Sequence, residues 1–363
     1  AHLLMTTIAY FISPHGFGHA SRATAVMQAM QRKENSIVFT IFTTVPEWFF
    51  ADQGLNQYEF IPSLHDVGLV QMTPFQEDLS DTLERLETIY PYSVNLVSNT
   101  VHKLRQDSVD LVICDIAPLG LVAARQCGIP SLLIENFTWD WIYKPFSDDY
   151  PQFSEFIHLL DSLFPLADYR IQAEPICFRL PNVPKVNEPI SRSFQNSSYV
   201  VRNELSLADE KLVLVSFGGN KEQFCNLDYF LEYADTIFLI AGRGEELHRE
   251  NNVISIPHNA PFYHPDLIQA SDIVIGKAGY STLAEVALAG KPFAFISRES
   301  NAESAVLAKH IIEHLPSIEI TQQEYLSRSW IEKLPEILEL KPTTPSPING
   351  ADLVAEFIFE EIL

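Results

Sequence analysis

A glycine-rich segment around position 280 carries residues that suit the binding of a phosphorylated ligand. It reads Gly276-Lys277-Ala278-Gly279-Tyr280-Ser281-Thr282-Leu283-Ala284-Glu285. A short apolar run precedes it and a helical pattern follows it, so we expect a strand, a tight turn and a helix. Glycines allow close approach of the backbone to a ligand, and the amides at a helix start favour an anion such as a diphosphate.

The side chains of this segment extend the interpretation. Ser281 and Thr282 place hydroxyls at the helix start, and the Glu285 carboxylate, one turn further on, can accept hydrogen bonds from ribose hydroxyls. Ordinary helix capping is the alternative, because Ser, Thr and an early Glu are all favoured in first turns. Two glycines, two hydroxyls and a carboxylate together favour a nucleotide-binding turn.

A second candidate site follows the first apolar run of the chain. Its loop reads Ser13-Pro14-His15-Gly16-Phe17-Gly18-His19, which places His19 at the start of a helix. A helix N-terminus disfavours a charged imidazolium, so His19 suits the role of a general base. Asp115 ends another apolar run and is expected at the same sheet edge, where it could orient the imidazole. Capping or loop hydrogen bonds are the alternative for both residues, and His15 is a rival base.

An aromatic cluster follows the apolar run at residues 131–134. Phe137, Trp139 and Trp141 lie close together with the carboxylate of Asp140. Such a cluster suits stacking on a sugar or on an apolar acceptor, and a hydrophobic loop anchor is the alternative. A weaker candidate is Arg243, which ends another apolar run and could offset the charge of a diphosphate.

Alternating strand and helix patterns run through both halves of the chain. They predict an α/β protein with two Rossmann-like, doubly wound parallel sheets facing across a cleft. Prolines at positions 181, 184 and 189 interrupt the alternation. We therefore expect an N-terminal acceptor-side domain over residues 1–185, a C-terminal donor-binding domain over residues 198–345, and a final helix within residues 346–363 that crosses the domain seam.

Composition narrows the class of partner. The chain has 363 residues, enough for two domains, and its formal net charge of −23 argues against nucleic acid as a partner.

The four cysteines are far apart and are expected to be reduced core residues. No membrane-spanning apolar run, signal peptide or Asp-x-Asp metal motif is found, so we expect a cytoplasmic location and no metal. Nothing in the sequence indicates an oligomeric state.

The chain resembles the family 1 and family 28 glycosyltransferases of the GT-B fold, including plant and macrolide UDP-glycosyltransferases and the peptidoglycan N-acetylglucosaminyltransferase. The resemblance covers essentially the whole chain and is strongest in the segment around position 280. It implies a metal-independent, inverting transfer of a sugar from a nucleotide sugar to a small or lipid-like hydroxyl acceptor, with no cofactor. UDP is the expected carrier, whereas guanine and thymine nucleotides stay open because the long tryptophan-led donor box is lacking.

The same resemblance assigns roles to individual residues. It implies that His19 is the base and that Asp115 supports it. It also places donor contacts in the second domain, at the phosphates, nucleobase, ribose or donor sugar. These donor residues are Gly218, Gly219, Asn220, Arg243, His258, Lys277, Gly279, Tyr280, Ser281, Thr282, Glu285, Glu299, Asn301 and Glu303.

A further resemblance is to the amino-terminal part of plant L-arabinokinases. It rests on residues 15–19, on Asn136-Phe137-Thr138-Trp139-Asp140 and on Ser297-Arg298-Glu299. The sugar-kinase module of those proteins is missing, so kinase activity is not implied. Two alternatives to transfer are a sugar-nucleotide 2-epimerase and a protein that binds sugar nucleotides without catalysis.

Overall fold

The chain forms two α/β units. The structure is a computed structural model, and it describes residues 6–73, 75–216, 228–257, 260–299 and 301–363. The first unit comprises Ala1–Arg192 together with Asn349–Leu363, and the second comprises Ser193–Ile348. The first change of unit therefore falls inside the proline-containing stretch from which the domain boundary was predicted.

The first unit is built on a sheet whose described strands all pair in parallel. Its strand order is β3-β2-β1-β6-β7-β8-β9, and β4 and β5 form a separate antiparallel pair. Apolar side chains dominate the central strands, as expected for a sheet covered on both faces. The strands are β1 (Thr7–Ile12), β2 (Val38–Thr43), β3 (Tyr58–Pro62), β4 (Gln71–Thr73), β5 (Gln76–Glu77), β6 (Leu111–Asp115), β7 (Ser131–Glu135), β8 (Tyr169–Ala173) and β9 (Lys185–Val186).

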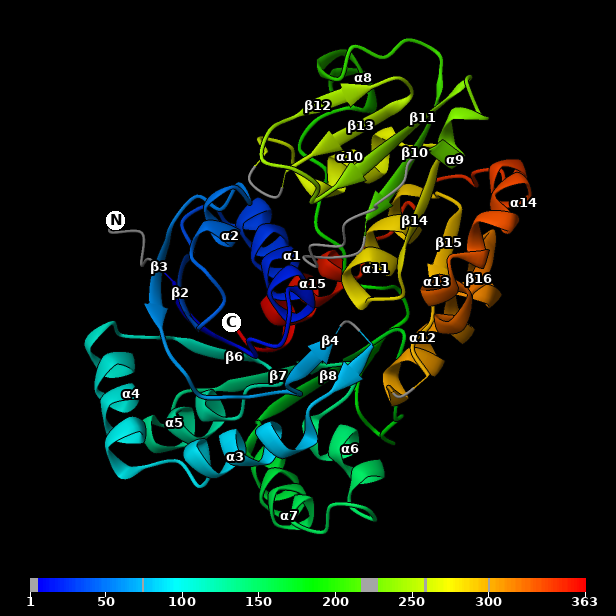
Figure 1. Cartoon of the computed structure of the whole chain (residues 1–363). Helices are drawn as coiled ribbons and strands as arrows, with labels where there is room; N and C mark the ends of the chain where they lie inside the picture. Colours follow the sequence, from blue (N-terminus) through cyan, green and yellow to red (C-terminus); the bar gives the residue numbers. More distant parts are fainter. Residues whose placement is uncertain (1–5, 74, 217–227, 258–259, 300) are drawn as a thin grey trace. The chain divides into compact units, whose positions relative to one another are not determined.

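Helices cover both faces of this sheet. In Figure 1, α1 and α15 lie side by side on one face, and α4 and α5 lie on the other. The helices are α1 (Gly18–Lys33), α2 (Trp48–Ala51), α3 (Leu79–Ile89), α4 (Val94–Gln106), α5 (Leu119–Cys127), α6 (Trp139–Tyr143), α7 (Phe153–Leu163) and α15 (Gly350–Glu361), with short 3-10 turns η1 (Lys144–Phe146) and η2 (Phe164–Leu166).

Helix α1 is buried on all sides between the sheet and α15. Every residue from position 19 to position 31 is buried, although the helix contains Arg22, Gln28 and Gln31. Each of these polar side chains donates hydrogen bonds: Arg22 to Asp115, and the two glutamines to backbone carbonyls. Burial of such side chains requires partners of this kind. The polar face of α1 is therefore fixed against the sheet edge.

The second unit is built on another mainly parallel sheet, in which only β12 pairs antiparallel among the described strands. Its strand order is β12-β13-β11-β10-β14-β15-β16. The strands are β10 (Lys211–Ser216), β11 (Thr236–Ala241), β12 (His248–Glu250), β13 (Val253–Ile256), β14 (Ile273–Lys277), β15 (Phe293–Ile296) and β16 (Ser317–Ile320). The helices are α8 (Ser198–Glu204), α9 (Asp228–Leu231), α10 (His264–Ala270), α11 (Tyr280–Ala289), α12 (Ala302–His314), α13 (Gln322–Ser327) and α14 (Leu334–Glu339), with the 3-10 turn η3 (Ser329–Lys333).

Both sheets have a topological switch point, a pair of adjacent strands from which the strand order continues in opposite directions. In the first unit it lies between β1 and β6, and in the second between β10 and β14. Ligands of open α/β sheets bind beyond the carboxyl ends of the strands at such points. The two candidate sites of the sequence follow β1 and β14, so both lie at a switch point.

Residues 79–106 form two helices, α3 and α4, because the chain leaves the helical conformation at Tyr90 and Pro91. Proline lacks the amide hydrogen that a helix interior needs. The final helix, α15, packs on α1 inside the first unit.

Candidate active site

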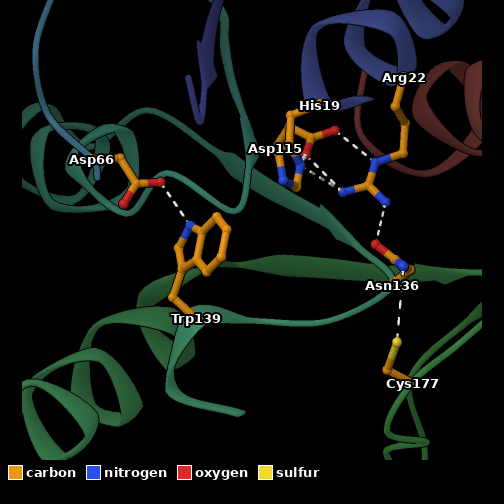
Figure 2. Close-up of polar contacts among 7 residues, drawn as sticks. All are labelled: His19, Arg22, Asp66, Asp115, Asn136, Trp139 and Cys177. Carbon is orange, nitrogen blue, oxygen red and sulfur yellow. Dashed lines mark hydrogen bonds and ion pairs between the residues drawn. The ribbon is translucent and has the colours of Figure 1, made fainter. Parts of the chain in front are cut away.

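The imidazole of His19 is bonded to the carboxylate of Asp115 in the first unit. The distance between His19 Nδ1 and Asp115 Oδ1 is 2.8 Å, as Figure 2 shows. Ile12 pairs with Asp115 across β1 and β6, which brings the loop before α1 next to the end of β6. Because a carboxylate only accepts, Nδ1 carries the hydrogen, and the neutral ring keeps Nε2 as an acceptor. This arrangement suits a general base.

Arg22 completes this pair and was not identified as a site residue from the sequence. Its guanidinium donates from Nε to Asp115 Oδ2 and from Nη2 to Oδ1, both at 2.7 Å. Burial by itself would raise the pKa of Asp115, but the charge and hydrogen bonds of Arg22, with the bond from His19, hold it below its ordinary value. Asp115 therefore stays ionised beside His19. The signal in the sequence was a cationic residue one turn after His19.

Asn136 extends the network toward the end of β7. Its Oδ1 accepts from Arg22 Nη1 at 2.6 Å, and its backbone carbonyl accepts from the amide of Cys177 at 2.8 Å. Figure 2 shows the side-chain contacts from His19 to Asn136, and the contact of 4.0 Å between Asn136 Nδ2 and Cys177 Sγ. No role of its own was predicted for Asn136, and in the structure its side chain accepts a hydrogen bond that orients Arg22.

The predicted acceptor residues divide into two pairs. Phe137 and Trp139 are 4% and 1% exposed, and both rings contact His19 edge-on, at centroid distances of 5.7 and 5.8 Å. They form a buried wall beside the imidazole rather than an open stacking surface. Asp140 and Trp141 are half-buried, and burial raises the pKa of Asp140.

The rival base His15 is a neighbour of the same tryptophan, Trp139. Its ring contacts Trp139 at 5.3 Å, and its Nδ1 accepts from the amide of Leu69 at 3.3 Å. The partner of Nδ1 is a carboxylate at His19, whereas at His15 Nδ1 accepts a hydrogen bond from a backbone amide. The geometry favours His19 as the base.

His65 and Asp66 are buried neighbours of this site. Trp139 donates its indole hydrogen to Asp66 Oδ2 at 2.8 Å, and the amide of Val67 donates to Oδ1. Burial raises the pKa of Asp66 from 3.8 to about 6 and lowers the pKa of His65 from 6.5 to about 4. No periodic pattern marks either residue in the sequence, because both lie in the irregular segment after β3.

These two pKa changes predict opposite dependences of stability on pH. Asp66 binds its proton more tightly in the folded protein, so its contribution falls as pH rises from about 4 to about 6. His65 binds its proton more tightly in the unfolded chain, so its contribution rises from pH 4 to 6.5. Each change corresponds to about 3 kcal/mol, and the two largely cancel.

Substitution should reveal each slope separately. As pH rises from 4 to 7, the stability of Asp66→Asn relative to the wild-type protein should increase by about 3 kcal/mol. The stability of His65→Gln relative to the wild-type protein should decrease by about 3 kcal/mol over the same range. Urea unfolding of the three proteins at several pH values measures both differences. Stability differences that do not vary with pH would contradict this prediction.

The donor segment of the second unit has the predicted strand, turn and helix. Lys277 ends β14, Gly279 is the N-cap of α11, and Tyr280 begins the helix. Lys277, Gly279, Ser281 and Thr282 are half-buried, and Tyr280 is buried. The amides of the first turn of α11 therefore begin at the sheet edge beside β10, as an anion site requires.

Two glycines of this segment have different surroundings. A Cβ on Gly276 would lie 2.3 Å from the carbonyl oxygen of Ser216, its partner on β10. A Cβ on Gly279 would have Lys277 O, at 4.0 Å, as its nearest neighbour. Gly276 is therefore needed for strand packing, and Gly279 leaves space that a ligand can use.

The same substitution at these two positions should have different effects. Gly276→Ala is expected to lower the stability of the second unit by about 1–3 kcal/mol, because the strands must separate. Gly279→Ala should cost less than about 1 kcal/mol in stability but weaken nucleotide binding. Melting curves and UDP titrations measure both effects. Unchanged nucleotide affinity in Gly279→Ala would contradict a backbone approach at this position.

Glu285 lies inside the second unit rather than at its surface. It is 1% exposed, and its Oε2 lies 3.2 Å from His264 Nδ1. His264 Nε2 in turn lies 2.9 Å from Ser216 Oγ. No role was predicted for His264, or for Ser216 by itself, from the sequence.

The other donor candidates have varied surroundings. Arg243 is half-buried on the loop after β11, and its amide donates to the carbonyl of Ile256. Asn301 caps α12 by accepting from the amide of Glu303 at 2.9 Å, while Glu299 is exposed. Asn301 therefore has a structural role of its own. Gly218, Gly219, Asn220 and His258 lie outside the described residues.

Among the described residues, no group of three or more His, Cys, Asp or Glu side chains is arranged to hold a metal ion. No helix in the described ranges has the length and apolar character needed to cross a membrane.

Known proteins resemble the chain in sequence. The Glycosyltransferase family 28 C-terminal domain matches residues 191–351, which coincide closely with the second unit. L-arabinokinase of Arabidopsis thaliana is 27% identical over 370 residues, covering 97% of this chain and 34% of that protein. The chain thus spans about a third of the length of that relative. The UDP-N-acetylglucosamine–N-acetylmuramyl-(pentapeptide) pyrophosphoryl-undecaprenol N-acetylglucosamine transferase of Bacillus subtilis (strain 168) is 22% identical over 346 residues, covering 88% of each chain.

Solved structures share the fold. The crystal structure of Acinetobacter baumannii MurG has a TM-score of 0.55 and 16% identity, with 98% of this chain and 99% of that chain covered. A UDP-glucosyltransferase from Polygonum tinctorium has a TM-score of 0.62 and 13% identity, with 99% and 98% covered. The predicted GT-B fold is confirmed. The family 28 domain match lies in the second of the two units of this fold.

Proposed function

We propose that the chain transfers a sugar from a nucleoside diphosphate sugar, with UDP as the expected carrier, to a hydroxyl acceptor with inversion at the anomeric carbon. The observation that carries this proposal is the bond between His19 and Asp115 at the switch point of the first sheet. This pair is the proposed base in one unit, and the family 28 domain match in the other unit supports the proposal of a donor site there. The thiols of Cys114 and Cys127 fit a reducing compartment, so we propose the cytoplasm as the location of the protein.

The proposed step moves one proton and one sugar. The acceptor hydroxyl gives its proton to His19 Nε2 as its oxygen bonds to the anomeric carbon. The bond between that carbon and the diphosphate oxygen breaks, and its electron pair leaves with the nucleoside diphosphate. Asp115 stabilises the resulting imidazolium, and Arg22 holds Asp115 in place.

The leaving diphosphate needs a positive environment. We place it at the first-turn amides of α11, with the hydroxyls of Ser281 and Thr282 and the ammonium group of Lys277 nearby. These groups compensate the developing charge without a metal ion, so EDTA should leave the rate unchanged. The acceptor, small or lipid-like, is proposed to approach His19 from the side of Asp140 and Trp141.

A binding screen followed by product analysis tests the proposal. UDP and UDP-sugars should raise the melting temperature of the unchanged protein, and Glu285→Ala should remove the shift. Released UDP and the anomeric configuration of the product, measured by NMR with a panel of acceptors, should show inversion. An epimerised donor formed without acceptor, or no response to any UDP, GDP or dTDP compound, would refute the proposed transfer.

A further inference from the structure

Three polar side chains of the second unit form a continuous hydrogen-bonded line. Ser216 Oγ lies 2.9 Å from His264 Nε2, and His264 Nδ1 lies 3.2 Å from Glu285 Oε2. The three residues belong to β10, α10 and α11, and their positions span 70 residues of sequence. Figure 1 shows these elements within one unit. The line ends at Ser216, the last residue of β10 at the switch point of the sheet.

The fold explains why these side chains meet. Helix α10 packs against β10, α8 and α11, and His264 is its first residue. Glu285 lies in the second turn of α11 and is 1% exposed, so its carboxylate needs a donor inside the unit. The acidic residue of α10, Asp266, accepts hydrogen bonds from the amides of Gln195 and Asn196. His264 is therefore the donor from α10 that serves Glu285.

The bonding pattern fixes the direction of each hydrogen bond. A carboxylate only accepts, so His264 Nδ1 donates to Glu285. In the neutral ring Nε2 then accepts, and the hydroxyl of Ser216 donates to it. The Ser216 and Glu285 side chains are 5% and 1% exposed, respectively, whereas that of His264 is 31% exposed. The imidazole thus joins two buried groups at the edge of the donor segment.

We propose that His264 is a positioning residue that holds the ribose-binding carboxylate of Glu285 and the hydroxyl of Ser216 in fixed relation. This inference rests on the proposed function, in which the diphosphate lies at the first turn of α11, beside the end of β10, and Glu285 accepts from the ribose hydroxyls. A carboxylate has several lone-pair positions, so Glu285 can accept from His264 and from a ribose together. The imidazole of His264 then orients Glu285 at the ribose end of the donor site and Ser216 at its phosphate end. The donor site thereby recognises the nucleoside and the diphosphate as one ligand.

A comparison of two ligands tests this role. Isothermal titration calorimetry would measure binding of UDP and of 2′,3′-dideoxyuridine 5′-diphosphate to the unchanged protein and to His264→Leu. Loss of His264 should weaken UDP binding by about tenfold or more, the usual effect of a lost hydrogen bond to a charged group. Binding of the dideoxy compound should be weakened clearly less than binding of UDP, since it loses only the orientation of Ser216 and has no ribose hydroxyls for Glu285 to bind.

Conservative and control variants separate positioning from packing. His264→Gln keeps one donor and one acceptor and should restore part of the UDP affinity. Ser216→Ala should weaken UDP binding but leave uridine binding unchanged, because only UDP reaches the phosphate end. His314→Ala, an exposed histidine at the far end of α12, should alter neither ligand. Melting curves would establish that each variant is folded.

The outcomes distinguish this inference from the proposed function. Equal weakening of both ligands in His264→Leu, or no weakening of either, would overturn the positioning role while the proposed function stands. If the unchanged protein binds neither UDP, GDP nor dTDP, the proposed function fails, and the inference fails with it. If GDP or dTDP binds instead, the same comparison is made with its dideoxy analogue.

Discussion

Replacing His19 with alanine is expected to lower the rate of sugar transfer by about 10²- to 10⁴-fold, the usual contribution of a positioned general base. The reason is the loss of the only imidazole that Asp115 contacts in the described structure. UDP affinity should stay unchanged, because the donor residues belong to the second unit. Steady-state rates of UDP release and a UDP titration of the same protein measure both quantities.

Two other histidines of the first unit provide the comparison. His102→Ala, an exposed position on α4, should leave the rate unchanged. His15→Ala removes the rival base and should reduce the rate less than His19→Ala, since its Nδ1 accepts from a backbone amide. A larger loss in His15→Ala than in His19→Ala would transfer the role of base to His15.

Arg22→Met should lower the free energy of unfolding of the first unit by about 3–5 kcal/mol, the range for breaking a buried ion pair. Asp115 is fully buried and receives two of its hydrogen bonds from Arg22. Removal of the guanidinium would leave a buried carboxylate without its cation. Urea unfolding followed by tryptophan fluorescence suits the measurement, since Trp48, Trp139 and Trp141 all belong to the first unit.

The same helix provides a matched control. Arg32, also on α1, pairs with Asp352, but both side chains are largely exposed, at 44% and 54%. Arg32→Met should therefore cost less than about 1 kcal/mol. The double variant Arg22→Met, Asp115→Leu should recover much of the lost stability, because no buried charge then lacks a partner. Equal costs for the two arginine substitutions would show that burial of the pair is not the cause.

The sequence predicted those parts of the site that follow from strand order. His19 and Asp115 end or follow apolar runs, and carboxyl ends of parallel strands meet at one sheet edge. The donor turn at Gly279 was predicted for the same reason, from a strand, small residues and a helix. These predictions needed only local patterns and the parallel topology.

Partners from distant elements were harder to predict. Arg22 meets Asp115 across 93 positions of sequence, and His264 meets Ser216 across 48. No local pattern specifies such pairs, because they depend on how helices pack on the sheet. Strand β8 was also missed, since its sequence Tyr-Arg-Ile-Gln-Ala mixes polar and apolar residues although it is paired in the sheet.

Helix α15 has a consequence for how the protein is made. The first unit consists of two separate segments, and the second segment, Asn349–Leu363, follows the whole second unit in the chain. Ala351, Val354, Ala355 and Ile358 of α15 are fully buried. On the ribosome, α1 therefore remains uncovered until the other unit has been synthesised, and the unit that begins first is completed last. A fragment that stops at Arg192 would expose this apolar surface, whereas a fusion of the two segments would restore it.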